Sequence, residues 1–241
     1  RVVSRWGTGS RPRNLDVTFT GQSGISFLGC AQETVCPAIR LKRANTYTGG
    51  TYVSGSRVCV AAEGALSTGP VEVLGGELAG GSIWFEAPGT YANDFTIGGF
   101  GRRVEKYNAD PFGALVFRED VTITGDVVLT EPTRVSVDTN LDSRITGTVS
   151  GDRLCVYSFI SGRTGVLELA GHNTYSGGTE ILQQSVAIRE ADGFGTGPVR
   201  VEKGTLVFRN DSAITVANRL YGHDATLRIE GKGEVTLADM N

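Results

Sequence analysis

Asn173-Thr174-Tyr175-Ser176-Gly177-Gly178-Thr179 is the stretch that decides the fold, because a near-copy, Asn45-Thr46-Tyr47-Thr48-Gly49-Gly50-Thr51, stands 128 residues earlier. The same offset relates three further pairs of segments: Val58 and Val60 with Val186 and Ile188, Thr68-Gly69-Pro70-Val71 with Thr196-Gly197-Pro198-Val199, and Gly76 and Leu78 with Gly204 and Leu206. A register held over about thirty residues indicates a structural repeat whose equivalent positions stack on one another.

Composition narrows the class of protein. The 241 residues carry a net charge of −3, so the chain lacks the basic field that binds nucleic acid, and no nucleic-acid partner is expected. No apolar run approaches the roughly 20 residues that span a bilayer. Residues 1–13 lack the apolar centre of a signal peptide. Because Val235-Thr236-Leu237 still has the pattern of a strand close to the last residue, we expect the chain to be a piece of a longer protein.

Short runs in which two apolar residues flank a polar one recur along the whole chain, with turn-forming residues between them. These runs are Val17–Phe19, Ile25–Phe27, Ile39–Leu41, Val71–Val73, Val121–Ile123, Val135–Val137, Leu167–Leu169, Val199–Val201, Ile214–Val216, Leu227–Ile229 and Val235–Leu237. Alternation with period two predicts strands, and the repeat favours a solenoid over a sandwich or barrel. The predicted fold is all-β, a right-handed parallel β-helix of roughly ten coils, about 50 Å long.

This architecture predicts which residues fill the core and which turn the chain. The inward column of each strand should be buried: Val58, Val60, Val71, Val73, Val121, Ile123, Val135, Val137, Val199, Val201, Leu206, Phe208, Leu227 and Ile229. We assign a structural role to the repeated turn, formed by Asn45, Tyr47, Gly49, Gly50, Asn173, Tyr175, Gly177 and Gly178. Its glycines permit positive φ and close stacking of backbones, and its asparagines can turn the chain through their own side-chain hydrogen bonds.

At these residues the sequence resembles the autotransporter-associated β-strand repeat of bacterial passenger domains, an apolar strand followed by Asn-Thr-Tyr-x-Gly-Gly-Thr. Leu167 through Thr179 matches this pattern well, and Leu41 through Thr51 nearly as well. The resemblance implies a β-helical passenger, exported through a C-terminal outer-membrane barrel outside this sequence, to the cell surface or beyond. Such passengers serve as adhesins, toxins or stalks. The implied partners are a host-cell or matrix protein or a glycan, together with self-association through the ends or sides of the solenoid.

We therefore divide residues 1–241, a single β-helix fragment, into four parts. Residues 1–40 are atypical coils with a cysteine loop, 41–97 are the first copy of the repeat, 98–166 are linking coils, and 167–241 are the second copy. Within the linking coils, residues 98–111 match nothing in the repeat and are expected to protrude. Insertions in solenoids map to surface loops that often bind partners.

The four cysteines divide into two kinds. Cys30 and Cys36 enclose five residues, which in an exported protein indicates a local disulfide. The alternative, a metal site, needs further ligands, and neither histidine is near in sequence. Cys59 and Cys155 are expected to be unpaired, because about four coils separate them, a distance near 19 Å that no disulfide bridges.

Two groups of residues are candidates for partner contact. Trp84 and Tyr91 follow a glycine pair and could form a sugar-stacking or protein-binding platform. The alternative, which we favour, is packing in the core or between stacked coils. The second group lies in the protruding loop: Arg102, Arg103, Lys106 and Tyr107. A solvated loop is the alternative for this basic cluster.

An enzyme is the competing hypothesis. Polysaccharide-cleaving β-helix enzymes place paired acids along a groove, and two pairs stand about one coil apart: Asp120 with Asp142, and Asp138 with Asp152. With 26 acidic residues in the chain such pairs also arise by chance, and we favour a solvated face. His172 and His223 are expected to be turn residues. We predict no cofactor and no metal, and a protein without catalytic activity.

Overall fold

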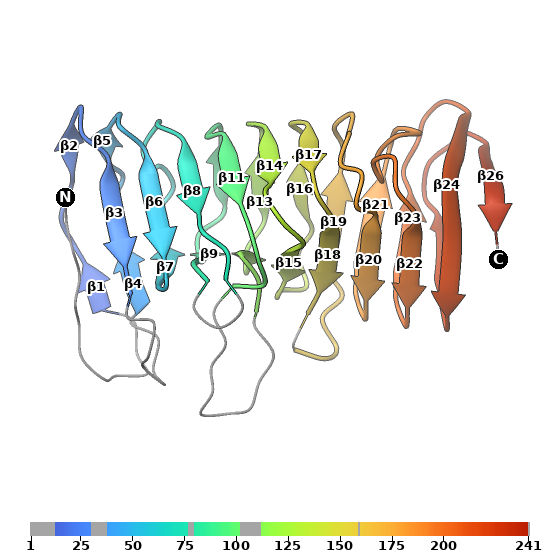
Figure 1. Ribbon diagram of the computed structural model, residues 1–241, viewed down its shortest axis with the longest axis horizontal. Coiled ribbons are helices and arrows are strands. Elements are labelled where there is room, and N and C mark those ends of the chain that lie inside the picture. Colours follow the sequence, from blue (N-terminus) through green and yellow to red (C-terminus); the bar gives the residue numbers. More distant parts are fainter. Residues whose placement is uncertain (1–12, 30–37, 77–79, 102–111, 159, 241) are drawn as a thin grey trace.

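The computed structural model describes residues 13–29, 38–76, 80–101, 112–158 and 160–240. The strands in these ranges follow one another along the long axis of a rod, from the N-terminal end to the C-terminal end (Figure 1). Within the same ranges no helix forms that could cross a membrane. Cys30, Cys36, Arg102, Arg103, Lys106 and Tyr107 lie outside the described residues, so the predictions made for them stay predictions.

Four sheets contain all the described strands. The eleven-stranded sheet consists of β1 (Arg13–Leu15), β4 (Ala38–Leu41), β7 (Arg57–Val60), β9 (Ser82–Phe85), β12 (Leu115–Phe117), β15 (Thr133–Val137), β18 (Leu154–Tyr157), β20 (Thr179–Leu182), β22 (Val199–Glu202), β24 (Ile214–His223) and β26 (Val235–Met240). The seven-stranded sheet consists of β10 (Gly89–Tyr91), β13 (Val121–Ile123), β16 (Ser143–Ile145), β19 (Val166–Leu169), β21 (Ser185–Ile188), β23 (Thr205–Phe208) and β25 (Thr226–Ile229). The six-stranded sheet consists of β3 (Ile25–Leu28), β6 (Thr51–Ser54), β8 (Val71–Val73), β11 (Phe95–Ile97), β14 (Val127–Leu129) and β17 (Val149–Gly151). A small sheet pairs β2 (Thr20–Gly21) with β5 (Thr46–Tyr47).

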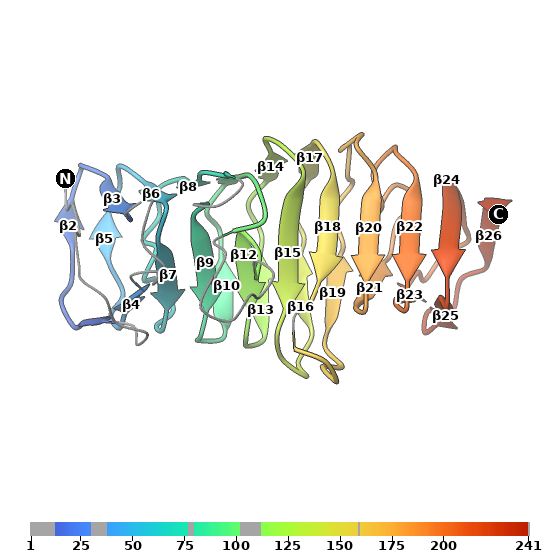
Figure 2. The same ribbon diagram turned by 60° about the horizontal axis from the view of Figure 1, so that its bottom comes forward.

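Each strand inside a sheet pairs in parallel with the strand one turn earlier and the strand one turn later, and each edge strand has one such partner. For example, Ile83 of β9 stands opposite Val58 of β7 on one side and Leu115 of β12 on the other. The result is a β-solenoid of about nine turns, seen from two directions in Figures 1 and 2. The predicted all-β parallel fold is confirmed, and the turn count is close to the one expected.

One predicted strand does not form. Residues 17–19 link β1 to β2 as a corner, and the Val17 side chain is 50% exposed. The Phe19 amide donates to the side-chain oxygen of Asn45 at 2.8 Å instead of joining a ladder. The apolar-polar-apolar pattern of these residues was therefore misleading, because a corner of a solenoid also contacts the core.

The core is one continuous apolar column inside the rod, and the alternation of the strands builds it. Twelve of the predicted core residues are buried: Val58, Val60, Val71, Val73, Val121, Ile123, Val135, Val137, Val199, Val201, Leu206 and Phe208. Leu227 and Ile229 are 47% and 64% exposed, so the prediction for these two was wrong. They lie in β25, the edge strand of the seven-stranded sheet, on which no other described strand stacks.

The two copies of the repeat occupy different sides of the rod. In the first copy the turn leads into β6 of the six-stranded sheet and then β7 of the eleven-stranded sheet. In the second copy the equivalent strands are β20 of the eleven-stranded sheet and β21 of the seven-stranded sheet. Between the copies each turn of the chain contributes a strand to all three sheets, from β10 to β18. The repeat is thus displaced around the axis by one sheet.

Candidate functional site

The asparagine of the repeated turn joins three successive turns of the solenoid. Asn173 accepts a hydrogen bond from the Val149 amide at 2.7 Å, and its side-chain amide donates to the Gly193 carbonyl, also at 2.7 Å. Asn45 does the same with the Phe19 amide and the Ala65 carbonyl. Both asparagines are buried. Their partners lie in neighbouring turns, and not within the same turn as the sequence suggested.

The tyrosine and threonine of the repeated turn form a buried pair inside the rod. The Tyr175 hydroxyl lies 2.7 Å from Oγ1 of Thr179, which itself donates to the Phe194 carbonyl at 3.3 Å. Tyr47 and Thr51 pair in the same way. Burial raises the pKa of the Tyr175 hydroxyl above its ordinary value, so the phenol stays neutral and acts as a hydrogen-bonding group.

The glycines of the repeated turn are required by its geometry. Gly50 and Gly178 have φ of 88° and 90°, a region that side chains disfavour. A Cβ at Gly178 would lie 2.6 Å from the Pro198 carbonyl oxygen. At Gly177 it would lie 2.4 Å from a carboxylate oxygen of Asp152 in the preceding turn. Of the features predicted for the glycine pairs, close stacking is found at Gly177 and Gly178, and positive φ at the second glycine of each pair, Gly50 and Gly178.

Two further asparagines also donate side-chain hydrogen bonds to the backbone of a neighbouring solenoid turn, and the sequence analysis did not find them. Asn93 donates to the carbonyls of Ser67 and Gly69, at 3.2 and 2.6 Å. Asn218 donates to the equivalent carbonyls of the second copy, at 3.0 and 2.6 Å: those of Gly195 and Gly197. The two asparagines stand 125 residues apart and not 128, so a search at a fixed offset missed them. The signal that could have found them is an asparagine about one solenoid coil, 20 to 23 residues, after the proline of each Thr-Gly-Pro segment.

The outer face of the eleven-stranded sheet gathers aromatic and charged side chains. Trp84 is 7% exposed, and its indole nitrogen donates to Oγ of Ser82 at 2.9 Å. The guanidinium carbons of Arg57 and Arg118 lie 4.4 and 5.1 Å from the centre of its ring. Tyr91, on the seven-stranded sheet, is buried against Phe85 in the core. Packing therefore accounts for Trp84 and Tyr91, and neither stands on an exposed platform.

Beside Trp84 a chain of ion pairs surrounds a hollow of about 350 Å³. Arg40 binds Glu86 at 2.6 Å, and Arg118 lies 3.7 Å from the same carboxylate. Arg118 and Arg163 approach the buried carboxylate of Asp138 at 3.3 and 3.6 Å. Burial raises the pKa of Asp138, against the opposing effect of the two arginines. Positive and negative groups alternate here, so the cluster ties neighbouring turns together.

Three of the four acids that suggested an enzyme are engaged in the fold: Asp138 in the ion-pair cluster described above, and Asp142 and Asp152. Asp142 accepts from the Val166 amide at 3.0 Å and from the Arg209 guanidinium at 2.8 Å. Asp152 accepts from the amide of the residue that follows it, at 2.8 Å. Asp120 is exposed. The described residues contain no group of three or more metal-binding side chains close enough to share an ion.

Cys59 and Cys155 are free, as predicted, and both are buried. They belong to β7 and β18, with three strands between them in the eleven-stranded sheet. Burial raises the pKa of each thiol to about 12, helped by the nearby carboxylate of Glu86 or Glu180. Thiols with such pKa values are poor nucleophiles at neutral pH.

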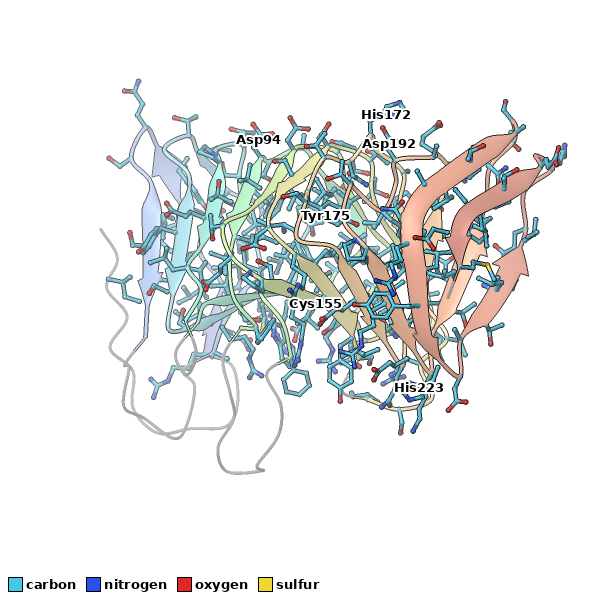
Figure 3. All side chains as sticks on the ribbon, turned by 45° about the vertical axis from the view of Figure 1, so that its right-hand side comes forward. Asp94, Cys155, His172, Tyr175, Asp192 and His223 are labelled. Atoms are coloured by element: carbon cyan, nitrogen blue, oxygen red, sulfur yellow. The ribbon has the colours of Figure 1, made fainter. Side chains whose placement is uncertain are left out.

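The histidines lie at opposite edges of the rod, as Figure 3 shows. His172 is exposed and lies 3.0 Å from a carboxylate oxygen of Asp192, whose hydrogen bond raises the pKa of the imidazole. His223 is also exposed, 3.9 Å from Glu202, at the end of β24. Both are surface residues next to turns, and His223 borders a second hollow in the outer face of the eleven-stranded sheet.

The fold and the repeated turn define a repeat-built parallel β-solenoid. Residues 41–55 and 164–183 match the family model of the passenger-associated-transport-repeat, and each match contains one copy of the repeated turn. The two matches are consistent with the repeat domain of an autotransporter passenger, as the sequence indicated. This family suggests secretion to the cell surface. No curated protein and no solved structure matches the chain significantly.

Proposed function

We propose that the chain is a non-catalytic segment of a passenger that is secreted or displayed at a bacterial surface, where it acts as an adhesin, a toxin passenger or a stalk. One observation carries the proposal. The repeated turn occurs twice, and the passenger repeat family matches both copies. In each copy the asparagine side chain makes hydrogen bonds to the turns before and after it. A chain built in this way extends as a rod whose sides remain available for contact.

The charged side chains support the same role. Arg209 binds three carboxylates along the seven-stranded sheet: Asp142 at 2.8 Å, Glu168 at 2.9 Å and Glu230 at 2.7 Å. Glu168 is buried and also binds Arg189. A network that joins several turns resists local opening better than isolated surface pairs, which contribute little. The network therefore suits a rod that must stay rigid outside the cell.

Labelling of intact cells tests the display. An epitope inserted between Ser161 and Gly162 lies in an exposed turn, where a Cβ at Gly162 would meet no atom within 4 Å. In the native protein of the producing bacterium, antibody should bind this epitope on unbroken cells or in the culture medium. A cytoplasmic protein with the same epitope is the control. Labelling that requires lysis, with none in the medium, would refute the proposal.

A second experiment tests the absence of catalysis. The purified chain is incubated with a broad panel of polysaccharides, and new reducing ends and unsaturated products are measured. We expect none above the level of a heat-unfolded sample. Release that Asp120→Asn abolishes would replace this proposal with the enzyme hypothesis, because Asp120 is the exposed member of the candidate pairs.

A further inference from the structure

We propose that a hollow at the corner between the eleven-stranded and seven-stranded sheets binds one carboxylate-bearing sugar residue of a glycan. This inference rests on the proposed role as a displayed segment and names a ligand class for it. The hollow, called here the corner hollow, measures about 240 Å³. Its lining consists of Arg134, Tyr157, Leu182, Gln183, Glu202, Lys203 and His223.

The strand register lines up four of these side chains. Tyr157, Leu182, Glu202 and His223 stand opposite one another on β18, β20, β22 and β24. Adjacent strands are about 4.8 Å apart, so the row extends about 14 Å along the rod. An aromatic ring, an aliphatic group, a carboxylate and an imidazole thus form one line on the outer face.

Three of the row members, Leu182, Glu202 and His223, are each followed in the sequence by a residue with a strained backbone. Gln183, Lys203 and Asp224 have φ of 54°, 52° and 52°, although none is glycine. The left-handed region costs an ordinary residue about 1–2 kcal/mol. In the first copy of the repeat the position equivalent to Gln183 is Gly55, with φ of 60°. At this position the second copy therefore carries a side chain where glycine would fit better, and strain of this kind gathers at functional sites.

One cationic group of the corner hollow, the guanidinium of Arg134, is held in place by aromatic rings. The guanidinium carbon of Arg134 lies 4.8 Å from the ring centre of Tyr157 and 4.9 Å from that of Phe100. Stacking on two rings orients the planar guanidinium, which matches a carboxylate in shape. Lys203 adds a second positive charge from the strained turn. The one carboxylate of the lining, Glu202, forms an ion pair with Arg200, which offsets part of its charge.

The mixture of groups favours a sugar over an acidic peptide. A sugar acid has one carboxylate, which the two cations can bind, and several hydroxyls, which Glu202 and the Gln183 amide can accept from or donate to. A run of acidic residues would bring a second carboxylate close to Glu202. The volume is below the roughly 300–1,000 Å³ of pockets for drug-sized ligands, so it suits a single sugar residue. Arg134 stacks on the Tyr157 ring, and Tyr157 is only half-buried, so part of its side chain stays exposed for the ligand.

Titration with defined saccharides tests the site. The 241-residue chain is titrated by calorimetry with two carboxylate-bearing probes, a hyaluronan octasaccharide and sialyllactose, and with their neutral counterparts, a chitin octasaccharide and lactose. Hexaglutamate is the acidic peptide. We expect at least one acidic saccharide to bind, and the neutral saccharides and hexaglutamate to bind at least 10-fold more weakly. Binding to neither acidic saccharide, or equal binding of hexaglutamate, overturns the proposal.

Lys203→Gly is the decisive variant. It removes the charged side chain and relaxes the positive φ, so its melting temperature should be no lower than that of the wild type. We expect it to weaken saccharide binding at least 10-fold, while Lys232→Ala, an exposed lysine outside the corner hollow, leaves binding unchanged. Equal binding by Lys203→Gly refutes the site. If intact cells still display the chain, that refutation leaves the proposed function standing.

Discussion

Replacing Asn173 with alanine should destabilise the rod far more than its single lost side chain suggests. The side chain is buried and makes two hydrogen bonds, from the Val149 amide and to the Gly193 carbonyl. Alanine removes both at once. It leaves a buried N–H in one turn and a buried C=O in another without the partner that each has now.

The magnitude follows from those two groups. A buried polar group that loses its partner costs about 1–3 kcal/mol, so the two groups together should lower the free energy of unfolding of Asn173→Ala by about 2–6 kcal/mol. Asn140 offers a matched control, because its side chain also accepts from a backbone amide, that of Thr164 at 3.2 Å, but at an exposed position. Water replaces the lost acceptor there, and Asn140→Ala should cost less than about 1 kcal/mol.

Urea unfolding followed by circular dichroism gives the free energies, and native-state hydrogen exchange of the Val149 amide locates the effect. A solenoid can unfold in parts, so the exchange measurement is needed to show that the turn around Asn173 has loosened. The reasoning is refuted if Asn173→Ala and Asn140→Ala shift the unfolding midpoint equally, or if the protection of the Val149 amide does not change.

Three further predictions concern other parts of the rod. Gly178→Ala should cost at least about 2 kcal/mol in urea unfolding and Gly162→Ala only about 1, because both have positive φ but a Cβ at Gly178 also meets a carbonyl oxygen at 2.6 Å; equal losses would contradict the clash. With pKa values near 12, the thiols of Cys59 and Cys155 should resist iodoacetamide at pH 8.5 until urea unfolds the chain, and peptide mass spectrometry that finds either labelled in the folded protein would count against their burial. Burial alone would raise the pKa of Glu168, but hydrogen bonds from two arginines outweigh burial and lower the pKa. The ionised Glu168 therefore stabilises the fold at pH values above the pKa it has in the unfolded chain, and this stabilisation is lost as the pH falls through its pKa in the folded protein. The difference in melting temperature between wild type and Glu168→Gln should therefore be largest near pH 7 and shrink below about pH 4, and a difference independent of pH would show that charge plays no part.

The sequence predicted correctly the features that depend on a residue's own strand or turn, such as the alternation of a strand or the backbone conformation of a glycine. A run such as Val121–Ile123 alternates because one face of the strand is inside, and the structure buries both of its apolar residues. The glycines at 50 and 178 were recognisable because a side chain is strongly disfavoured at φ near 90°. The repeated turn could likewise be assigned to structure, since two copies in register indicate stacking and not chemistry.

The sequence did not reveal features that depend on which residues lie in the adjacent turn of the solenoid. Asn45 and Asn173 looked like local turn residues, because the amide and carbonyl that they bind are 20 to 26 residues away. Leu227 and Ile229 have the pattern of core residues, and only their place in the last strand exposes them. The corner hollow was equally invisible, since Arg134 and Lys203 come from strands and turns far apart in the sequence.

The displacement of the repeat by one sheet has a consequence for how the rod presents its surfaces. If the two copies lay on the same sheets, equivalent outward residues such as Tyr52 and Glu180 would point the same way. Instead Tyr52 stands on the six-stranded sheet and Glu180 on the eleven-stranded one. The intervening turns, which contribute three strands each, therefore set the rotation of the second copy about the long axis as well as its distance from the first. Removing one 128-residue unit would shorten the rod and also swing everything beyond the junction around its axis, so that a partner fixed on one side would meet a different face.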